Sequence, residues 1–356
     1  MAAVPAGAFD HFVAMCDDTG LFQHAILGVP DRHHGYCVDD NARALLLCCH
    51  IGDHGHGALA RRLAPRFAAF VQHAWNPDCA RFRNFMGYDR RWLEPQGSQD
   101  SHGRTLWALG ECAARADDPL LAQWAARLFA QALHVVSAFA SPRALAFTLI
   151  GLNGYCPAQP QDREAARLRL VLATRVHEQL ADYASADWHW FEDRLSYDNA
   201  RLCEALIVSG EGLGLRAMTQ AGLTALRWLL TMQTAPEGHF RPVGSAGFLA
   251  GSRESPAAFD QQPVDAWATI AACHAAMVAD PAAEWQKAAA RAFAWFGGAN
   301  DLGLPLADHA TGSCRDGLHP DRANENRGAE SVLSYLLSLT DMRRLARLTP
   351  ALTTAI

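Results

Sequence analysis

The spacing of apolar residues is the feature that most limits how this chain can fold. Apolar residues recur at helical spacing along nearly all of the 356 residues, whereas alternating runs rich in Val, Ile and Thr are nearly absent. This period predicts an all-α protein. The twelve expected helices span residues 5–17, 39–51, 57–75, 102–115, 119–139, 142–154, 162–185, 198–209, 213–233, 261–279, 281–297 and 328–345.

The expected helices are of two kinds, which alternate along the chain. One kind carries arginines on one face, as in LARRLAPRFAAFVQHAW, and is expected to lie outside. The other is apolar nearly all round, as in SVLSYLLSL, and is expected to be enclosed. The alternation predicts a single domain over residues 1–356, an (α/α)6 toroid of six inner and six outer helices. An open helical solenoid is the alternative.

The connections also alternate, in length. Links from an inner helix to the next outer helix are short, whereas nearly all links in the other direction are long. In an antiparallel array all links of one kind lie at one end, so the long loops are expected to converge on the face where the inner helices begin. Loops of this length are usually functional. They span residues 18–38, 76–101, 186–197, 234–260 and 298–327.

The composition excludes several classes of protein. Half of the residues are hydrophobic and 19% are charged, which predicts a large core. The net charge of −6, without a basic tract, argues against a nucleic-acid partner. Lys287 is the single lysine among 31 basic residues, so a phosphate-binding loop ending in GK[ST] is absent. A Schiff-base enzyme would depend on Lys287, which lies among polar neighbours in a helical stretch.

The cysteines and the N-terminal segment predict a cytoplasmic protein. Ten cysteines are scattered without C-x-x-C spacing, which favours reduced thiols over a disulfide framework. The first residues, MAAVPAGAFDHF, lack the basic and apolar regions of a signal peptide. Since no run of eighteen apolar residues occurs, we expect no membrane partner.

Acidic residues in two of the long loops are the candidate catalytic groups. The tetrapeptide Asp-Asn-Ala-Arg opens two inner helices, beginning at Asp40 and at Asp198. Such an Asp can simply cap a helix. Glycosidic cleavage, however, needs one carboxylic acid to protonate the leaving oxygen and a second carboxylate as base or nucleophile. We therefore expect Asp40 and Asp198 to form the catalytic pair, with Asp39, Glu192 and Asp193 as alternates.

The same loops carry the side-chain types of a sugar-binding site. Tryptophan faces stack on sugar rings, while carboxylates, amides, histidines and arginines form hydrogen bonds with hydroxyl groups. The expected binding residues are His34, Tyr36, His102, Arg104, Trp188, Trp190, His239, Arg241, Asp260, Gln262, His319, Glu325 and Glu330. No cofactor is expected.

A metal site is also not expected. His50, Asp53, His54 and His56 are near one another in sequence, but they fall in a short link at the opposite end of the predicted ring. The zinc-protease pattern H-E-x-x-H does not occur, and neither does the G-x-S-x-G pattern of serine hydrolases.

Five motifs together resemble a known group of proteins. They are HGYCVDDNARAL, FRNFMGYDRRW with SQDSHGRTLWALG, WHWFEDRLSYDNARL, GHFRPVG with FDQQP, and CRDGLHPDRANENRGAES. The chain resembles the six-hairpin (α/α)6 glycosidase superfamily. Within it, the chain is most similar to a bacterial glycosyltransferase-like helical family, which also occurs as a C-terminal domain of nucleotide-sugar glycosyltransferases. The resemblance implies an (α/α)6 barrel, carbohydrate substrates and acidic catalytic residues.

Three functions follow from these observations. The leading hypothesis is a glycoside hydrolase that acts on an oligosaccharide or glycan fragment by carboxylate acid–base catalysis. The second is a sugar epimerase or isomerase that uses paired histidines among His102, His239 and His319. The third is a non-catalytic glycan-binding partner of a separate glycosyltransferase. The chain has no βαβ pattern and no Gly-rich nucleotide loop, so it is not expected to transfer sugar from a nucleotide itself.

Overall fold

The computed structural model describes residues 7–348 and confirms the expected order of helices. Within this range the α-helices are α1 (Asp10–Ala14), α2 (Val38–Ile51), α3 (Gly57–Ala74), α4 (Gln99–Arg115), α5 (Pro119–Leu133), α6 (Pro142–Ala158), α7 (Arg163–Tyr183), α8 (Ala200–Leu213), α9 (Arg216–Met232), α10 (Pro263–Ala279), α11 (Ala283–Phe296) and α12 (Ala329–Leu348).

Two helices differ from the expectation. The first is short, because the chain leaves the helix at Met15 and Cys16 pairs with Leu21 in an antiparallel bridge. Residues 5 and 6 of this expected helix lie outside the described range. The expected helix 119–139 is α5 followed by a 3₁₀ turn at His134–Ala138. A 3₁₀ turn of this kind is common at a helix C-terminus.

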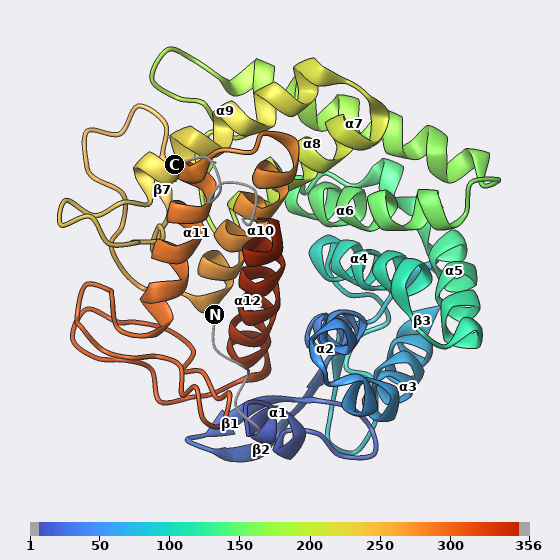
Figure 1. The fold of residues 1–356 in the computed structure, drawn as a ribbon. Coiled ribbons are helices and arrows are strands. Elements are labelled where there is room, and N and C mark those ends of the chain that lie inside the picture. Colours follow the sequence, from blue (N-terminus) through green and yellow to red (C-terminus); the bar gives the residue numbers. More distant parts are fainter. Residues whose placement is uncertain (1–6, 349–356) are drawn as a thin grey trace. The chain divides into compact units, whose positions relative to one another are not determined.

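Within residues 7–348 the chain forms two compact units, one of residues 13–176 and the other of residues 7–12 with 177–348. In the first unit, α2, α4 and α6 pack side by side, and α3 and α5 cover α2 and α4 (Figure 1). Helices α4 and α6 meet backbone to backbone at Gly110 and Gly151. A Cβ atom on Gly110 would lie 2.2 Å from the carbonyl oxygen of Gly151, so this approach requires glycine.

The second unit repeats this arrangement with α8, α10 and α12. Helix α10 contacts both α8 and α12, while α9 and α11 cover α8 and α10 (Figure 1). The inner helix α10 is buried on nearly every side, from Pro263 to Met277. The outer helix α9 buries one stripe only, including Leu223, Leu226 and Leu229. The two predicted kinds of helix therefore differ in burial as expected.

The long loops contain short strands that the sequence did not predict. Strands β1 (Phe22–Ile26), β2 (Val29–Cys37) and β5 (Phe85–Met86) form an antiparallel sheet in the order β1-β2-β5. Two further pairs are β3 (Trp75–Asn76) with β4 (Arg81–Phe82), and β6 (Arg194–Leu195) with β7 (Phe248–Leu249). Most of these strands have two residues, too few to show a period of alternation.

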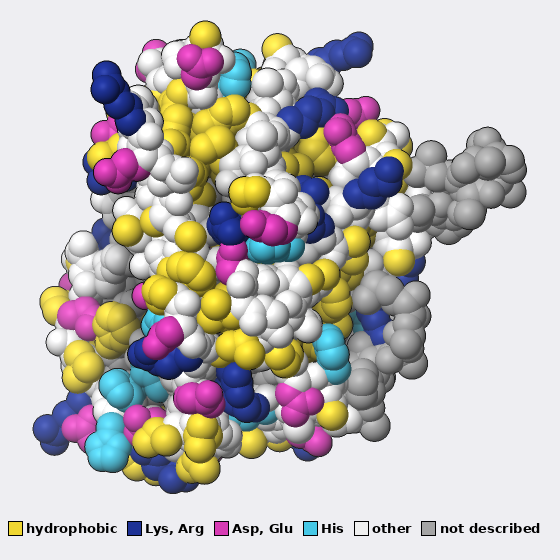
Figure 2. All heavy atoms as spheres, turned by 90° about the vertical axis from the view of Figure 1, so that its left-hand side faces the viewer, with side chains coloured by type: hydrophobic (Ala, Val, Ile, Leu, Met, Phe, Trp, Pro, Cys, Tyr) yellow, Lys and Arg dark blue, Asp and Glu magenta, His cyan; other side chains and the backbone are white. Residues whose placement is uncertain are grey.

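The surface carries polar and charged side chains among hydrophobic ones (Figure 2), and the cysteines do not form disulfides. No helix within residues 7–348 is long and apolar enough to cross a membrane. All ten cysteines are free thiols. On the face drawn in Figure 2, acidic, basic and histidine side chains are interspersed with hydrophobic ones. Mixed charge of this kind is typical of a solvated protein surface.

Candidate functional site

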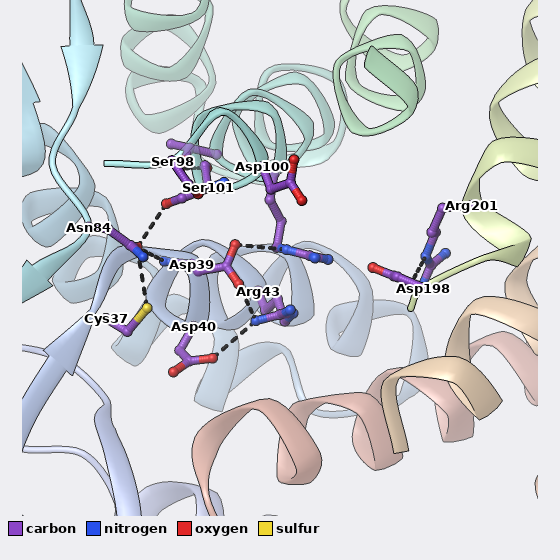
Figure 3. A network of polar contacts seen from close by, with 12 residues as sticks. Cys37, Asp39, Asp40, Arg43, Asn84, Ser98, Asp100, Ser101, Asp198 and Arg201 are labelled. Carbon is purple, nitrogen blue, oxygen red and sulfur yellow. Dashed lines mark hydrogen bonds and ion pairs between the residues drawn. The ribbon is translucent and has the colours of Figure 1, made fainter. Parts of the chain in front are cut away.

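In the first unit, β2 leads directly into α2 and places two carboxylates in its first turn. Asp39 Oδ1 accepts a hydrogen bond from Arg104 Nε at 2.8 Å, and its Oδ2 lies 2.8 Å from Arg43 Nη1 (Figure 3). Arg43 also donates to Asp40 Oδ1 at 3.1 Å. Both arginines are almost fully buried, and Arg104 stacks on the ring of Phe147 at 4.0 Å. The predicted residues Asp39, Asp40 and Arg104 thus belong to one buried ionic network.

Asn84 holds the starts of α2 and α4 together. Its Oδ1 accepts hydrogen bonds from the Ser101 hydroxyl at 2.8 Å, from the Asp39 backbone N–H at 3.3 Å and from the Cys37 thiol at 3.3 Å (Figure 3). The Asn84 carbonyl also accepts from Val38 N–H at 2.8 Å. Sequence reasoning did not single out Asn84, and a lone Asn in a loop carries no signal for this role.

Asp39 and Asp100 of this network have pKa values shifted in opposite directions. Burial alone would raise the pKa of Asp39, but the adjacent Arg104 and Arg43 together lower it. For Asp100, in the first turn of α4, burial raises the pKa despite a hydrogen bond from the Ser141 hydroxyl. Carboxyl groups with pKa values pushed apart can serve as a base and an acid. The sequence placed Asp100 in a polar loop without assigning it a role.

His102 is one of the predicted binding residues that the structure buries. Its Nε2 donates to Ala132 O at 2.9 Å, and its Nδ1 accepts from Phe82 N–H at 3.4 Å. The side chain is fully buried, and burial lowers the pKa of His102 to about 3. Because both ring nitrogens bond to the backbone, this geometry corrects the expected sugar-binding role to a structural one.

We expect His102 to make folding stability depend on pH. A histidine whose pKa is about 3 when folded and near 6.5 when unfolded takes up protons mainly in the unfolded state below pH 6.5. Its contribution is therefore complete above pH 6.5 and falls by about 1.4 kcal/mol per pH unit as the pH decreases towards 3. Urea unfolding from pH 7 to pH 4 should show a weaker pH dependence for His102→Gln than for wild type.

The exposed His134 of the same unit provides the matched control for this experiment. The variant His134→Gln should keep the wild-type dependence of unfolding free energy on pH. Equal slopes for wild type and His102→Gln would contradict the assignment of His102 as a neutral buried group.

Tyr36 and His34 lie in β2 but in different surroundings. Tyr36 is buried, stacks on Phe22 at 5.0 Å and donates its hydroxyl proton to Asp17 at 2.6 Å. Burial, followed by this bond to Asp17, raises the pKa of Tyr36. His34 is exposed and lies 3.6 Å from Asp31. Tyr36 therefore packs in the core of the sheet, while His34 keeps an accessible ring.

In the second unit, Asp198 lies at the start of α8 in a wholly buried ion pair. Its Oδ1 is 3.4 Å from Arg201 Nε (Figure 3), and Arg201 also donates to Glu204 at 2.5 Å. The Arg201 guanidinium stacks on Trp267 at 3.9 Å. Asp198 has a φ of 50°, a left-handed conformation that is uncommon outside glycine and often marks functional sites.

The repeated Asp-Asn-Ala-Arg motif makes similar side-chain contacts in both units, although Asp40 lies within α2 and Asp198 precedes α8. In each copy the Asp pairs with the Arg three residues later. The Asn amides bond back to the preceding segment, Asn41 to Cys37 O at 2.8 Å and Asn199 to Ser196 O at 3.2 Å. Neither Asp is the N-cap residue, a position taken by Cys37 and Asn199. The capping explanation for these two carboxylates is therefore wrong.

The two tryptophans expected to bind sugar are core residues. Trp190 is fully buried against Phe191 and Trp228, and Trp188 packs edge-on against Trp228 at 5.0 Å. Trp188 also donates its indole N–H to Glu192 O at 2.7 Å. Since neither face is open, the expected stacking platform is corrected to a hydrophobic cluster. The nearby Asp193 is exposed and bonds to Arg194.

His319 and Asp260 form a close pair in the second unit. His319 Nδ1 lies 2.7 Å from Asp260 Oδ1, and both side chains are partly exposed. Leu318 N–H donates to Gln261 O at 2.9 Å, and Gln261 N–H donates to Leu318 O at 3.0 Å, which aligns the two segments. Within residues 7–348, no protein group bonds to Nε2 of His319. The pair thus resembles the carboxylate–imidazole arrangement of general bases.

A second histidine lies on Asp301, a residue that sequence reasoning did not select. Asp301 Oδ1 accepts from Arg241 Nε at 2.8 Å and is 3.2 Å from His239 Nε2. Asp301 Oδ2 accepts from Gln261 Nε2 at 2.5 Å. Burial alone would raise the pKa of Asp301, but the hydrogen bonds from Arg241 and Gln261 lower it. His239 and Arg241, both expected binding residues, therefore meet at Asp301, and Gln261 links this cluster to its chain neighbour Asp260.

The remaining predicted binding residues lie on other parts of the second unit. Gln262 is the half-buried residue before α10 and makes no side-chain capping bond. Glu325 is mostly exposed and lies 3.7 Å from Arg315. Glu330 is half-buried in the first turn of α12. The recorded ion pair of Glu325 is thus with Arg315 and not with the Asp301 cluster.

His50, near the end of α2, and Asp53, in the short link that follows, each lie beside a charged side chain. His50 lies 3.7 Å from Glu111, and Asp53 lies 3.9 Å from Arg115. In the part of the chain that the structure describes, no three or more His, Cys, Asp or Glu side chains are grouped so as to hold a metal ion.

Comparison of the sequence with protein families and with curated proteins finds no match. Comparison of the structure finds several. A D-mannose isomerase matches with a TM-score of 0.74 and 11% identity, over 96% of this chain and 94% of that one. A cellobiose 2-epimerase from Bacillus thermoamylovorans matches with a TM-score of 0.71 and 10% identity, over 95% of each chain.

A third similar structure is a family 76 glycoside hydrolase from a bovine Bacteroides thetaiotaomicron strain. It matches with a TM-score of 0.65 and 10% identity, over 96% of this chain and 77% of that one. Likeness of this extent, together with the alternating inner and outer helices, identifies the fold. The chain has the all-α fold of the (α/α)6 toroid.

Proposed function

We propose that this protein is a carbohydrate-active enzyme that isomerises or epimerises a sugar. The proposal rests on the partly exposed His319–Asp260 pair, in which the carboxylate engages Nδ1 and leaves Nε2 able to accept a proton. An orienting carboxylate stabilises the imidazolium that forms when a histidine accepts a proton. The similar structures support a sugar substrate, since two of them are named as an isomerase and an epimerase of sugars.

The chemistry proposed for His319 is proton transfer beside a carbonyl. In an open-chain aldose, Nε2 of His319 removes the proton on C2, and the electron pair forms the C1–C2 double bond while the carbonyl oxygen takes up a proton. The resulting enediol then regains a proton on carbon. Protonation of C1, with loss of the proton on O2, gives the ketose. Protonation of C2 on the opposite face, with loss of the proton on O1, restores the aldehyde and gives the epimer. His239 is the second group able to carry a proton.

The test is incubation of the purified protein with a panel of aldoses, ketoses and disaccharides in D₂O. Conversion accompanied by deuterium at C1 or C2 of the product, seen by mass spectrometry and NMR, is the expected result. Conversion without deuterium can arise when the enzyme shields the transferred proton, so substrate deuterated at C2 should then show a slowed rate. Glycan binding without any product, or cleavage alone, would refute the proposal.

A glycoside hydrolase is the second candidate, supported by a separate observation in the first unit. Asp100 has a raised pKa and Asp39 a lowered one, which suits them to act as acid and base of glycosidic cleavage. A family 76 glycoside hydrolase is among the similar structures. Asp40 and Asp198, the pair expected from sequence, remain a proposal, but each faces an arginine one helical turn away.

If the protein cleaves oligosaccharides, Asp100→Asn should lower turnover by about 100-fold or more, because an amide cannot donate the proton that the leaving oxygen needs. Release of reducing ends from a defined oligosaccharide panel measures this loss. The exposed Asp78 of the same unit gives the control Asp78→Asn, which should keep wild-type turnover. Undiminished cleavage by Asp100→Asn would show that Asp100 is not the acid in glycosidic cleavage.

A further inference from the structure

Gln261 is a buried glutamine that touches both histidine–carboxylate pairs. It is fully buried, at the junction between the loop after α9 and the start of α10. Its side chain bonds to Asp301, which faces His239, and its backbone pairs with Leu318, next to His319. Its neighbour in sequence is Asp260, which holds His319. Gln261 therefore connects the two halves of the cluster.

The orientation of the Gln261 amide follows from its partners. The indole N–H of Trp295 can only donate, and it lies 2.7 Å from Oε1 of Gln261. The amide nitrogen must then face acceptors, and it donates to Asp301 Oδ2 at 2.5 Å and to Ala258 O at 2.8 Å. Every polar atom of this side chain is thus satisfied, and a rotated amide would place two donors against each other.

Asp301 links Gln261 to His239 and limits the orientation of the His239 ring. One carboxylate oxygen accepts from Gln261, while the other accepts from Arg241 and faces His239. A carboxylate held at both oxygens keeps a fixed plane, and its imidazole neighbour takes a fixed ring orientation. The Asp301 side chain is 9% exposed, so water competes little for these contacts.

We propose that Gln261 is a positioning residue. With Trp295 and Asp301, it holds the imidazole rings of His239 and His319 in the orientations that proton transfer needs. This inference rests on the proposed isomerase or epimerase function. Gln261 itself touches no substrate and moves no proton. Its effect is on the orientation of two imidazoles that lie in different loops, at His239 and at His319. A catalytic pair needs such support, since a displacement of a catalytic group by about 1 Å strongly lowers the rate of the catalysed reaction.

The test compares Gln261→Met with a matched control, Gln233→Met. Methionine keeps the length of glutamine but cannot donate to Asp301. Gln233 is also fully buried in the same unit, but its side chain accepts from Thr269 instead. The readout is the imidazole nitrogen and ring-proton resonances of His239 and His319, assigned by single His→Gln variants. Gln261→Met should shift both sets of resonances, whereas Gln233→Met should leave both at their wild-type positions.

A second variant, Trp295→Phe, tests the same proposal if Gln261→Met does not fold. Trp295→Phe keeps an aromatic side chain, although a smaller one, and removes the indole N–H, which frees the Gln261 amide to rotate. It should shift the same resonances by a smaller amount. In the catalytic assay, Gln261→Met should lower kcat at least tenfold with little change in KM, because orientation for proton transfer is lost while sugar binding is kept.

The outcomes separate this inference from the proposed function. Shifted resonances in a protein that converts no sugar would leave the positioning role standing and refute the isomerase. Unchanged resonances in folded Gln261→Met would overturn the positioning role, whatever the activity. Equal shifts in Gln261→Met and Gln233→Met would also overturn it, because they would show only a general loosening of the unit.

Discussion

Replacing His319 with glutamine should lower sugar conversion by 10²- to 10⁴-fold, the range that a positioned acid–base side chain contributes. Glutamine fills similar space and can still donate to Asp260, which lies 2.7 Å from Nδ1 in the native pair. It cannot accept a proton, so the C2 proton has no base. Both kcat and the incorporation of solvent deuterium should fall together, while KM for the sugar changes little.

His309 of the same unit is the control for this substitution. It also engages an oxygen through Nδ1, the hydroxyl of Tyr335, but it lies outside the His319–Asp260 pair. His309→Gln should retain wild-type conversion. Asp260→Asn is a second test of the pair. It keeps the shape of the side chain but removes the charge that stabilises the imidazolium, and we expect sugar conversion to fall at least tenfold. Normal deuterium exchange in His319→Gln would exclude His319 as the base.

Arg201→Met should give the largest loss of stability. Arg201 is fully buried and pairs with both Asp198 and Glu204, so methionine would leave two buried carboxylates without their cation. Removing one partner of a buried ion pair costs about 3–5 kcal/mol in unfolding free energy. Stacking on Trp267 is lost as well. Urea or thermal unfolding at pH 7 measures the change.

The pH dependence of this loss has a definite sign. Burial raises the pKa of Glu204, and Arg201 opposes that rise. Without Arg201 the Glu204 carboxyl gains a proton more readily, so lowering the pH from 7 to 5 should reduce the destabilisation of Arg201→Met relative to wild type. The exposed Arg216 gives the control Arg216→Met, which should change stability by less than about 0.5 kcal/mol. A similar loss in both variants would contradict the role of the buried pair.

The alternation of helices could be predicted from sequence because it depends on burial alone. An enclosed helix such as α10 must be apolar all round, and a covering helix such as α9 needs one apolar stripe. The Asp-Asn-Ala-Arg repeat was also informative, since in both copies the Asp pairs with the Arg three residues later, at Asp40 within α2 and at Asp198 just before α8. Regular backbone makes local spacing a reliable guide.

The direction of loop side chains could not be predicted in the same way. Trp188 and Trp190 turn into the core, in the loop where β6 pairs with β7, a segment about fifty residues later. Asp301 stands between Asn300 and Leu302 with nothing in that stretch to distinguish it, and its role comes from Arg241 and Gln261, distant in sequence. The pKa of Asp100 likewise depends on burial, which spacing does not reveal.

The glycine contact between α4 and α6 has a consequence for how this protein could be changed. Because Gly110 and Gly151 meet with no room for a methyl group, a side chain at either position would force the backbones of α4 and α6 apart. The loops that precede α4 and α6 therefore both lead into helices that are held against each other at this contact. A library of substitutions in those loops should therefore keep both glycines, and also Asn84, which bonds to the starts of α2 and α4. This pair marks the part of the first unit to leave untouched when its loops are redesigned.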